Sequence, residues 1–124
     1  MTSKRIDKPW GYEEIWAHTS YYVGKILFVK KGCRLSLQHH DQKMEDMLVM
    51  QGHLLLELEN DQGEIQTSEL VSGDCIHVSP KKRHRIEAYQ DSTIIEVSTP
   101  HLEDVIRHED DYGRTKSLDS ESKF

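Results

Sequence analysis

The chain has 124 residues, of which 35% are hydrophobic, and a formal net charge of −6. This length fits one ordinary domain with a modest core, and the acidic balance argues against nucleic acid as the main partner. No run approaches the roughly 18 apolar residues of a membrane span, and no apolar segment follows the charged N-terminus as a signal peptide requires. The sequence therefore predicts a cytoplasmic protein that does not associate with membranes.

The N-terminal part of the chain is predicted to form short strands. Residues 1–7 are polar, and we expect them to be loose. Residues 8–16 begin with turn formers and continue as a strand, in which Trp10 and Trp16 are expected to be buried. Residues 21–30 carry the β-branched and aromatic side chains of a further strand.

A hairpin is predicted between residues 32 and 52, which are both glycine. Its first strand ends near His40, a short polar corner follows at residues 41–43, and an apolar strand then begins at Glu45. Side chains alternate in direction along a strand, so Gln38 and His40 share one face. The hairpin therefore presents two potential metal ligands on its first strand and one on its second.

Turn residues divide the rest of the chain into further short strands. The predicted strands cover residues 52–59, 64–71, 75–78, 84–88 and 93–98. Residues 102–108 are expected to form a short helix or an extended exit, and the small, polar residues 115–124 are expected to be disordered. About nine or ten short strands with hardly any helical period predict an all-β fold, a jelly-roll or barrel.

A metal site needs a further ligand from outside the hairpin, and His84 is the best candidate because it lies in a second glycine-bounded strand unit. Two imidazoles, a carboxylate and an amide oxygen suit borderline divalent metals: zinc, cobalt, nickel, manganese or iron. The alternative is a metal-free core in which His40 and His84 are hydrogen-bonded polar groups. His39 faces the other side of its strand, and His53 and His77 have no partner motif, so we expect none of these three to bind metal.

Basic residues are concentrated around these motifs. Cations near a metal pocket suit a small anionic ligand such as a sugar phosphate, and the alternative for each of them is a solvated position at a strand end or turn. They are Lys25, Lys30, Lys31 and Arg34 before the hairpin, and Lys81, Lys82, Arg83 and Arg85 around His84.

Two spaced motifs resemble those of the cupin family. The first consists of Gly32, Gln38, His40, Glu45 and Gly52, and the second of Gly73, Pro80 and His84. Cupins usually have His at position 38. The Gln found there narrows the resemblance to phosphomannose isomerases, in particular the cupin domain of the bifunctional type that also carries a mannose-1-phosphate guanylyltransferase domain. The opening, last strand and closing segment of that domain are matched by residues 8–11, 96–97, 104–107 and 109–114.

The resemblance implies one cupin domain over residues 1–114, a double-stranded β-helix with a jelly-roll-like barrel. It also implies metal-dependent isomerisation of mannose 6-phosphate to fructose 6-phosphate through an enediol. Zinc is the first metal to expect, with Gln38, His40, Glu45 and His84 as its ligands. In the family the opening segment often packs on a partner subunit, which implies a homodimer.

Three positions depart from the family pattern. Met47 stands where the family usually has Trp, Asp46 where it usually has His, and Ala88 where the second motif usually closes with Asn. The first two leave open whether the substrate is mannose 6-phosphate or another sugar.

Aldose–ketose isomerisation moves a proton between C1 and C2, and it needs a base that reaches both carbons. A carboxylate, a histidine or a hydroxide on the metal could serve. Glu96 is our candidate, because a charge on the last apolar strand is costly unless it faces a polar cavity. The alternative is that Glu96 forms an ion pair with an arginine such as Arg85 or Arg107.

Other side chains are expected to contact the substrate. Lys25 and Arg85 fall on positions matched in the family, and they are expected to act in catalysis beside the phosphate or the enediolate. Arg107 and Tyr112, from the exit segment, are expected at the pocket mouth, and Lys82 is expected to bind substrate as well.

Two further functions are compatible with the same residues. One is a cupin enzyme, an isomerase or epimerase, that acts on another phosphosugar or on a nucleotide sugar of polysaccharide biosynthesis. The other is a non-catalytic cupin that binds a sugar and is stabilised by it without forming product.

Overall fold

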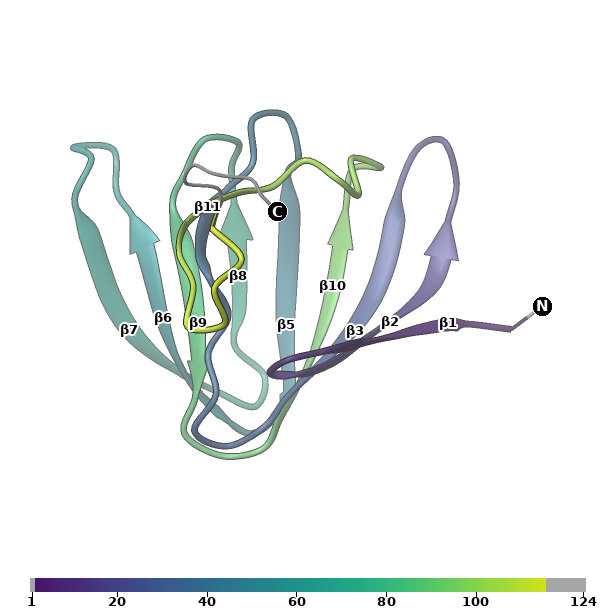
Figure 1. Cartoon of the computed structure of the whole chain (residues 1–124), viewed down its shortest axis with the longest axis horizontal. Helices are drawn as coiled ribbons and strands as arrows, with labels where there is room; N and C mark the ends of the chain where they lie inside the picture. The colour runs from purple at the N-terminus through teal and green to yellow at the C-terminus, as the bar shows by residue number, and fades with distance from the viewer. Residues whose placement is uncertain (1, 116–124) are drawn as a thin grey trace.

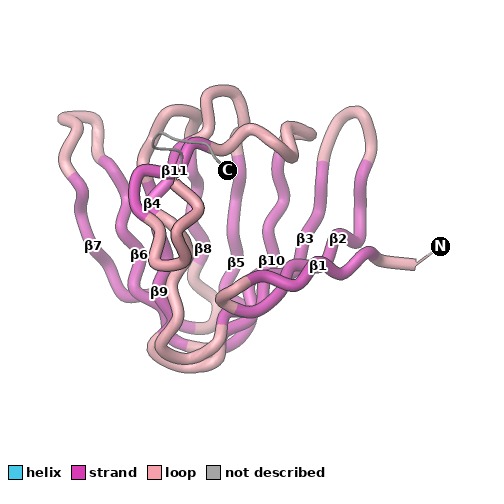
Figure 2. Tube along the Cα trace, in the orientation of Figure 1, coloured by secondary structure: helices cyan, strands magenta, loops and turns pink. Residues whose placement is uncertain are grey.

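The computed structural model describes residues 2–115, which form two antiparallel sheets and no helix (Figures 1 and 2). The six-stranded sheet has the spatial order β1 (Lys4–Lys8), β2 (Gly11–His18), β3 (Val23–Val29), β10 (Ser92–Ser98), β5 (Glu45–Gln51) and β8 (Cys75–Val78). The five-stranded sheet has the order β11 (Ile106–Glu109), β4 (Leu37–His39), β9 (His84–Ala88), β6 (His53–Glu59) and β7 (Ile65–Val71). This arrangement confirms the all-β jelly-roll prediction.

The N-terminal residues form a strand that was not predicted, whereas residues 102–108 adopt one of the two predicted conformations. The prediction that residues 1–7 are loose was wrong, because β1 pairs with β2. The Arg5 guanidinium also lies 3.9 Å from the centre of the Tyr12 ring. Of the two alternatives for residues 102–108, the extended one holds, because β11 pairs with β4 at the end of a segment that crosses from the first sheet to the second (Figure 1). Residues 116–124 of the predicted tail lie outside the described residues. Nothing in residues 2–115 is a helix of the length and apolarity needed to cross a membrane.

The space between the sheets has an apolar end and a polar end. On β5 the buried side chains change from Glu45 to Met47 and Val49, and on β9 they change from His84 to Ile86. The strands β3 and β10 show the same change, and the pairing of the strands places their charged positions at a common end. The apolar end is the core, formed by Trp10, Leu27, Val29, Met47, Val49, Leu54, Leu56, Leu70, Val78, Ile86, Ala88 and Ile94. Since burying each such side chain contributes about 1.5–3 kcal/mol, this end holds the sheets together and leaves the other free for chemistry.

The outer face of the six-stranded sheet carries exposed apolar side chains. Trp16 was expected to be buried but is 50% exposed, so that prediction was wrong. Glu13 lines the cavity and Ile15 is paired with the buried Lys25, so alternation along β2 points Trp16 outward. It lies over Gly24, where an added Cβ would meet the Trp16 ring at 2.7 Å. Leu48, Met50 and Val97 are also exposed, and they alternate with the inward-facing residues of β5 and β10.

Candidate metal centre

A cavity of about 110 Å³ lies where the polar ends of the strands meet. One water needs about 10–15 Å³ on the same measure, so the cavity has room for a small ligand. Its lining contains more cations than anions. The cations are Lys8, Lys25, Lys43, Arg85, Arg107 and Arg114, and the anions are Glu13, Glu45, Glu96 and Asp104.

Three buried side chains in this lining form a compact group: His40 from the end of the first hairpin strand, Glu45 from the start of β5 and His84 from the start of β9. One ligand atom from each lies within 4.8 Å of the others. His40 Nε2 is 3.2 Å from Glu45 Oε1, and His84 Nε2 is 3.9 Å from Glu45 Oε2. The spacing of the hairpin and the second strand unit therefore brings together three of the four predicted ligands.

The hydrogen bonds of the two imidazoles leave their facing nitrogens free. His40 Nδ1 donates to the Asp104 carbonyl at 2.6 Å, and His84 Nδ1 donates to the Lys82 carbonyl at 2.9 Å. A carbonyl only accepts, so Nδ1 of each ring carries a proton, and in a neutral imidazole Nε2 then has the lone pair. Burial lowers the pKa of His84, which favours this neutral form. Both Nε2 atoms are buried without a hydrogen-bond partner among the described residues, and the Glu45 carboxylate lies within 4 Å of each of them, so this donor set fits a divalent metal.

Gln38, the fourth predicted ligand, lies on the same wall. It pairs with His84 on one side and with Arg107 on the other, and its side chain lines the cavity. The buried Ser36 hydroxyl donates to Gln38 Oε1 at 2.9 Å, which fixes the amide beside the imidazoles. Coordination by this amide oxygen stays a prediction.

Lys43 belongs to the site, although the sequence indicated only a short polar corner at residues 41–43. It is only 6% exposed, and its Nζ is 3.1 Å from Glu45 Oε1 and 3.1 Å from Glu96 Oε2. These two carboxylates raise the pKa of Lys43 even though its burial acts to lower it. Lys43 therefore bridges a candidate metal ligand and the candidate base.

Asp104 holds the backbone of residues 41–43 in the conformation that directs Lys43 into the cavity. Its carboxylate accepts hydrogen bonds from the backbone N–H groups of Asp41, Gln42 and Lys43, at 3.0, 2.7 and 2.9 Å. Burial opposes ionisation, but these N–H bonds prevail and bring the pKa of Asp104 to about 2. The carbonyl of the same residue holds His40, so one residue positions both sides of the corner. The local sequence gives no sign of this role, because the two segments are more than 60 residues apart.

Glu96 is buried and lines the cavity, as its place on an apolar strand predicted. Its partner is Lys43, however, and neither Arg85 nor Arg107 forms an ion pair with it among the described residues. Burial and then the negative charge of Glu45 raise the pKa of Glu96, while Lys43 acts in the opposite direction. A carboxylate in this setting can exchange a proton with a ligand in the cavity.

The other predicted catalytic residues also line the cavity. Lys25 is paired with Glu96 across β3 and β10, and its Nζ is 3.4 Å from Glu13 Oε2. Arg85 is buried and donates to the carbonyls of Leu35 and Glu109 at 3.1 and 3.2 Å. The backbone thus fixes its guanidinium in the wall.

Only one of the three predicted substrate-binding residues lines the cavity. Arg107 lines the cavity, but Lys82 and Tyr112 do not. Lys82 Nζ is 2.7 Å from Asp61 Oδ1, on the turn after β6, and Tyr112 packs against the hydrophobic core. We therefore leave Lys82 and Tyr112 out of the site.

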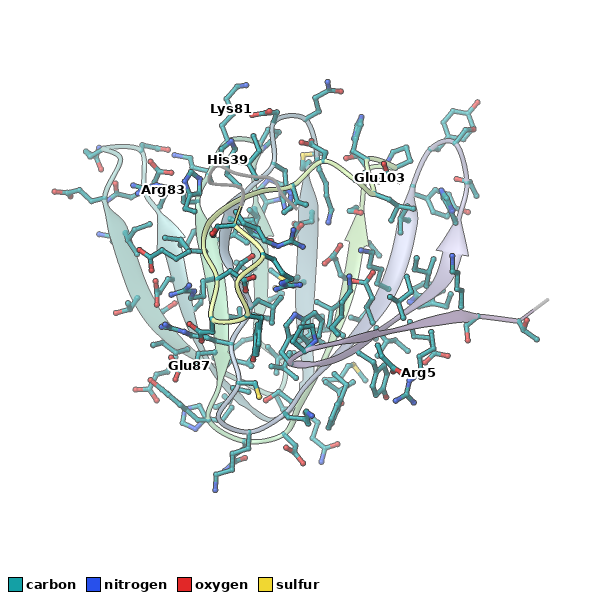
Figure 3. The ribbon with its side chains drawn as sticks, in the orientation of Figure 1. Arg5, His39, Lys81, Arg83, Glu87 and Glu103 are labelled. Carbon is teal, nitrogen blue, oxygen red and sulfur yellow. The ribbon has the colours of Figure 1, made fainter. Side chains whose placement is uncertain are left out.

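The remaining histidines of the prediction have other partners. His39, labelled in Figure 3, contacts His108 through Nδ1 at 2.7 Å and Asp41 through Nε2 at 3.2 Å. His53 bonds to Glu69 at 2.7 Å, and His77 bonds to Asp46 at 2.6 Å on the outer face of the sheet. All three lie outside the candidate metal cluster.

Comparison with known proteins supplies the family. A family model described as mannose-6-phosphate isomerase C-terminal matches residues 1–114. The chain is similar in structure to KdgF from Halomonas sp., with 25% identity and a TM-score of 0.68 over 78% of this chain and 86% of that one. It also resembles Bacillus subtilis oxalate decarboxylase, with 13% identity and a TM-score of 0.75, over 85% of this chain but only 30% of the decarboxylase. No curated protein matches the chain. The second likeness supports the cupin fold alone, and the family match shows that this chain belongs to the mannose-6-phosphate isomerase C-terminal family of cupins.

Proposed function

We propose that the protein is a metal-dependent isomerase of a sugar phosphate, most simply of mannose 6-phosphate and fructose 6-phosphate. The observation that supports this proposal is the buried carboxylate of Glu96. It lines the same cavity as the candidate ligand Glu45, and Lys43 forms an ion pair with both carboxylates. A divalent ion held by His40, Glu45 and His84, with Gln38 as a fourth ligand, would polarise the substrate oxygens at C1 and C2 as a Lewis acid. Zinc is the first ion to test, followed by manganese, cobalt, nickel and iron; Mn(II) centres occur in Bacillus subtilis oxalate decarboxylase.

The proton transfer is assigned to Glu96. Its carboxylate takes the C2 proton of the aldose, the C–H electron pair forms the C1=C2 bond, and the π pair of the carbonyl moves to the C1 oxygen, which takes a proton from water to give the enediol. The same carboxyl then returns a proton to C1, the C1=C2 pair forms the new C1–H bond, and the hydroxyl at C2 gives its proton to water as its electron pair forms the C2=O bond of the ketose. Burial favours this role because it makes the carboxylate more basic.

Cations next to Glu96 would support the reaction. Lys25 faces Glu96 across two paired strands, and Lys43 is 3.1 Å from its carboxylate. Both ammonium groups can stabilise the negative charge that develops on the enediol oxygens. Arg85 adds a fixed positive charge in the wall.

Met47 favours a second candidate, an isomerase or epimerase for another phosphosugar or a nucleotide sugar. Its side chain is buried and lines the cavity at a position where the family usually has Trp, so the cavity differs in shape. Asp46, the other departure, lies on an outward position and bonds to His77, so it does not reshape the cavity.

The experiment is a coupled assay for fructose 6-phosphate formed from mannose 6-phosphate, on protein loaded with each metal in turn. We expect metal-dependent turnover that Glu96→Gln lowers by about 100-fold or more without loss of metal. The matched control is Glu103→Gln, which makes the same change at the periphery of the molecule (Figure 3). Turnover in Glu96→Gln equal to wild type would refute the role of Glu96. Turnover only on another sugar would support the second candidate, and stabilisation by sugars without any product would identify a binding module.

A further inference from the structure

Three cations in the cavity lining come from elements that contribute nothing to the candidate metal cluster. Lys8 ends β1, Arg107 lies on β11, and Arg114 follows β11. The β1–β2 hairpin and the exit segment, residues 99–114, lie about 100 residues apart in the chain, and both contribute to the lining of this one cavity. Figure 1 shows where β1 and β11 lie. This group has no part in the proton transfer described above.

Two of these cations have no compensating partner. Arg114 bonds to Asp110 through Nε at 2.8 Å and through a terminal nitrogen at 3.1 Å, so its charge is balanced. Lys8 and Arg107 form no ion pair with any residue from 2 to 115. The Arg107 Nε atom is, in addition, buried and has no hydrogen-bond partner in the part of the chain that the structure describes. Leaving such a donor unpaired is costly, which indicates a ligand that supplies the acceptor.

The charges around Lys8 also indicate that an anion binds here. Burial lowers the pKa of Lys8, and although Glu13 opposes this effect, the charges of Lys25, Arg114 and Arg107 lower it further. Repulsion between like charges in a partly buried place destabilises the protein, and a bound anion would reduce this repulsion.

We propose that Lys8 and Arg107, with Arg114 beside them, form the subsite for the phosphoryl group of the substrate, an assignment that rests on the proposed function. The charge balance favours phosphate over a carboxylate: two unpaired cations match a phosphate monoester of about −1.5 to −2 at pH 7. A guanidinium offers two parallel N–H donors to phosphoryl oxygens, and an ammonium adds a point charge.

The exit segment holds this subsite in place. Arg34 forms a two-point ion pair with Asp111, at 2.6 and 2.8 Å, and Arg85 donates to the Glu109 carbonyl at 3.2 Å. Glu109 and Asp111 lie between Arg107 and Arg114 in the sequence. The subsite is therefore fixed before ligand arrives, which limits the ordering cost of binding.

The test uses inorganic phosphate as the probe on metal-free protein, so that the anion cannot bind to a metal. Calorimetry should find one phosphate per chain, and both Lys8→Gln and Arg107→Gln should weaken it about tenfold or more. Arg5→Gln is the matched control, because Arg5 lies on the same strand but packs over Tyr12. Without phosphate, the variants should melt no lower than wild type, since they remove unpaired like charges, and Arg107→Lys should restore part of the affinity.

A second arm separates this proposal from the isomerase. Mannose 6-phosphate should bind more tightly than mannose, and Arg107→Gln should abolish that preference and raise KM more than it lowers kcat. Phosphate affinity that is unchanged in Lys8→Gln and Arg107→Gln would overturn the subsite, even if the protein isomerises. Binding that depends on these residues with no turnover on any sugar phosphate would uphold the subsite and overturn the isomerase.

Discussion

Replacing Lys43 with Met tests the charge balance of the centre. Lys43 is the cation that separates Glu45 and Glu96, with 3.1 Å to each carboxylate, and all three side chains are buried. Removing one partner of a buried pair costs about 3–5 kcal/mol, because the remaining charge is uncompensated. At about 4 °C per kcal/mol for a domain of this size, we expect the melting temperature of the metal-free protein to fall by about 12–20 °C.

Metal should reverse part of this loss. A divalent ion next to Glu45 supplies the positive charge that Lys43 supplied, and Lys43 no longer competes for Glu45 Oε1. If the ion recovers about half of the cost, roughly 2 kcal/mol, the variant binds metal about 30-fold more tightly than wild type. Differential scanning calorimetry with and without metal, and competition with a chelator of known affinity, measure the two quantities.

The control is Lys82→Met, the same change at an exposed pair with Asp61, which should cost less than about 1 kcal/mol with or without metal. The reasoning is refuted if Lys43→Met destabilises the metal-free and metal-loaded proteins equally and leaves the metal affinity unchanged.

Three further predictions concern the exit segment and the outer face. Asp104→Ala should weaken metal binding about tenfold, since it releases the corner beside His40, and competition titration should show no such loss in Glu103→Gln. The pKa of Asp104 is lowered to about 2, so its stabilisation is complete above about pH 4 and is lost as the pH falls toward 2. In Asp104→Asn, acid unfolding followed by circular dichroism should depend less on pH across that window. The homodimer expected from the resemblance would bury the opening segment, where Trp16 is 50% exposed, so Trp16→Lys should produce monomers in light scattering; a monomeric wild type would contradict this.

The strand pattern could be predicted because most strands are bounded by glycine or other turn residues and alternate in burial. The strands at 75–78 and 84–88 begin and end where the sequence placed them. The polar strand β1 could not be found this way, because it is held by pairing with β2 and by Arg5 over Tyr12. The outward position of Trp16 follows from the alternation of β2, and burial was expected only because tryptophan is apolar.

Sequence patterns located the site residues that lie on or next to strands, but not those whose positions depend on contacts with residues far away in the chain. His40, Glu45 and His84 could be assigned from alternation and spacing, since each is on or next to a strand end whose inward face is set by the core. The inward turn of Lys43 depends on Asp104, far away in the chain, so the polar corner predicted at residues 41–43 gave no sign of it. Lys82 was misplaced for a related reason, since its partner Asp61 lies on the turn of a different hairpin.

The most direct test of the account is the metal content of the purified protein, together with a titration of metal-free wild type and His84→Ala. We expect one divalent ion per chain, a rise in melting temperature when the ion is added, and the loss of both in the variant. A wild-type protein that takes up no divalent ion, or a His84→Ala variant that binds it as tightly as wild type, would contradict the metal centre on which the proposed function depends.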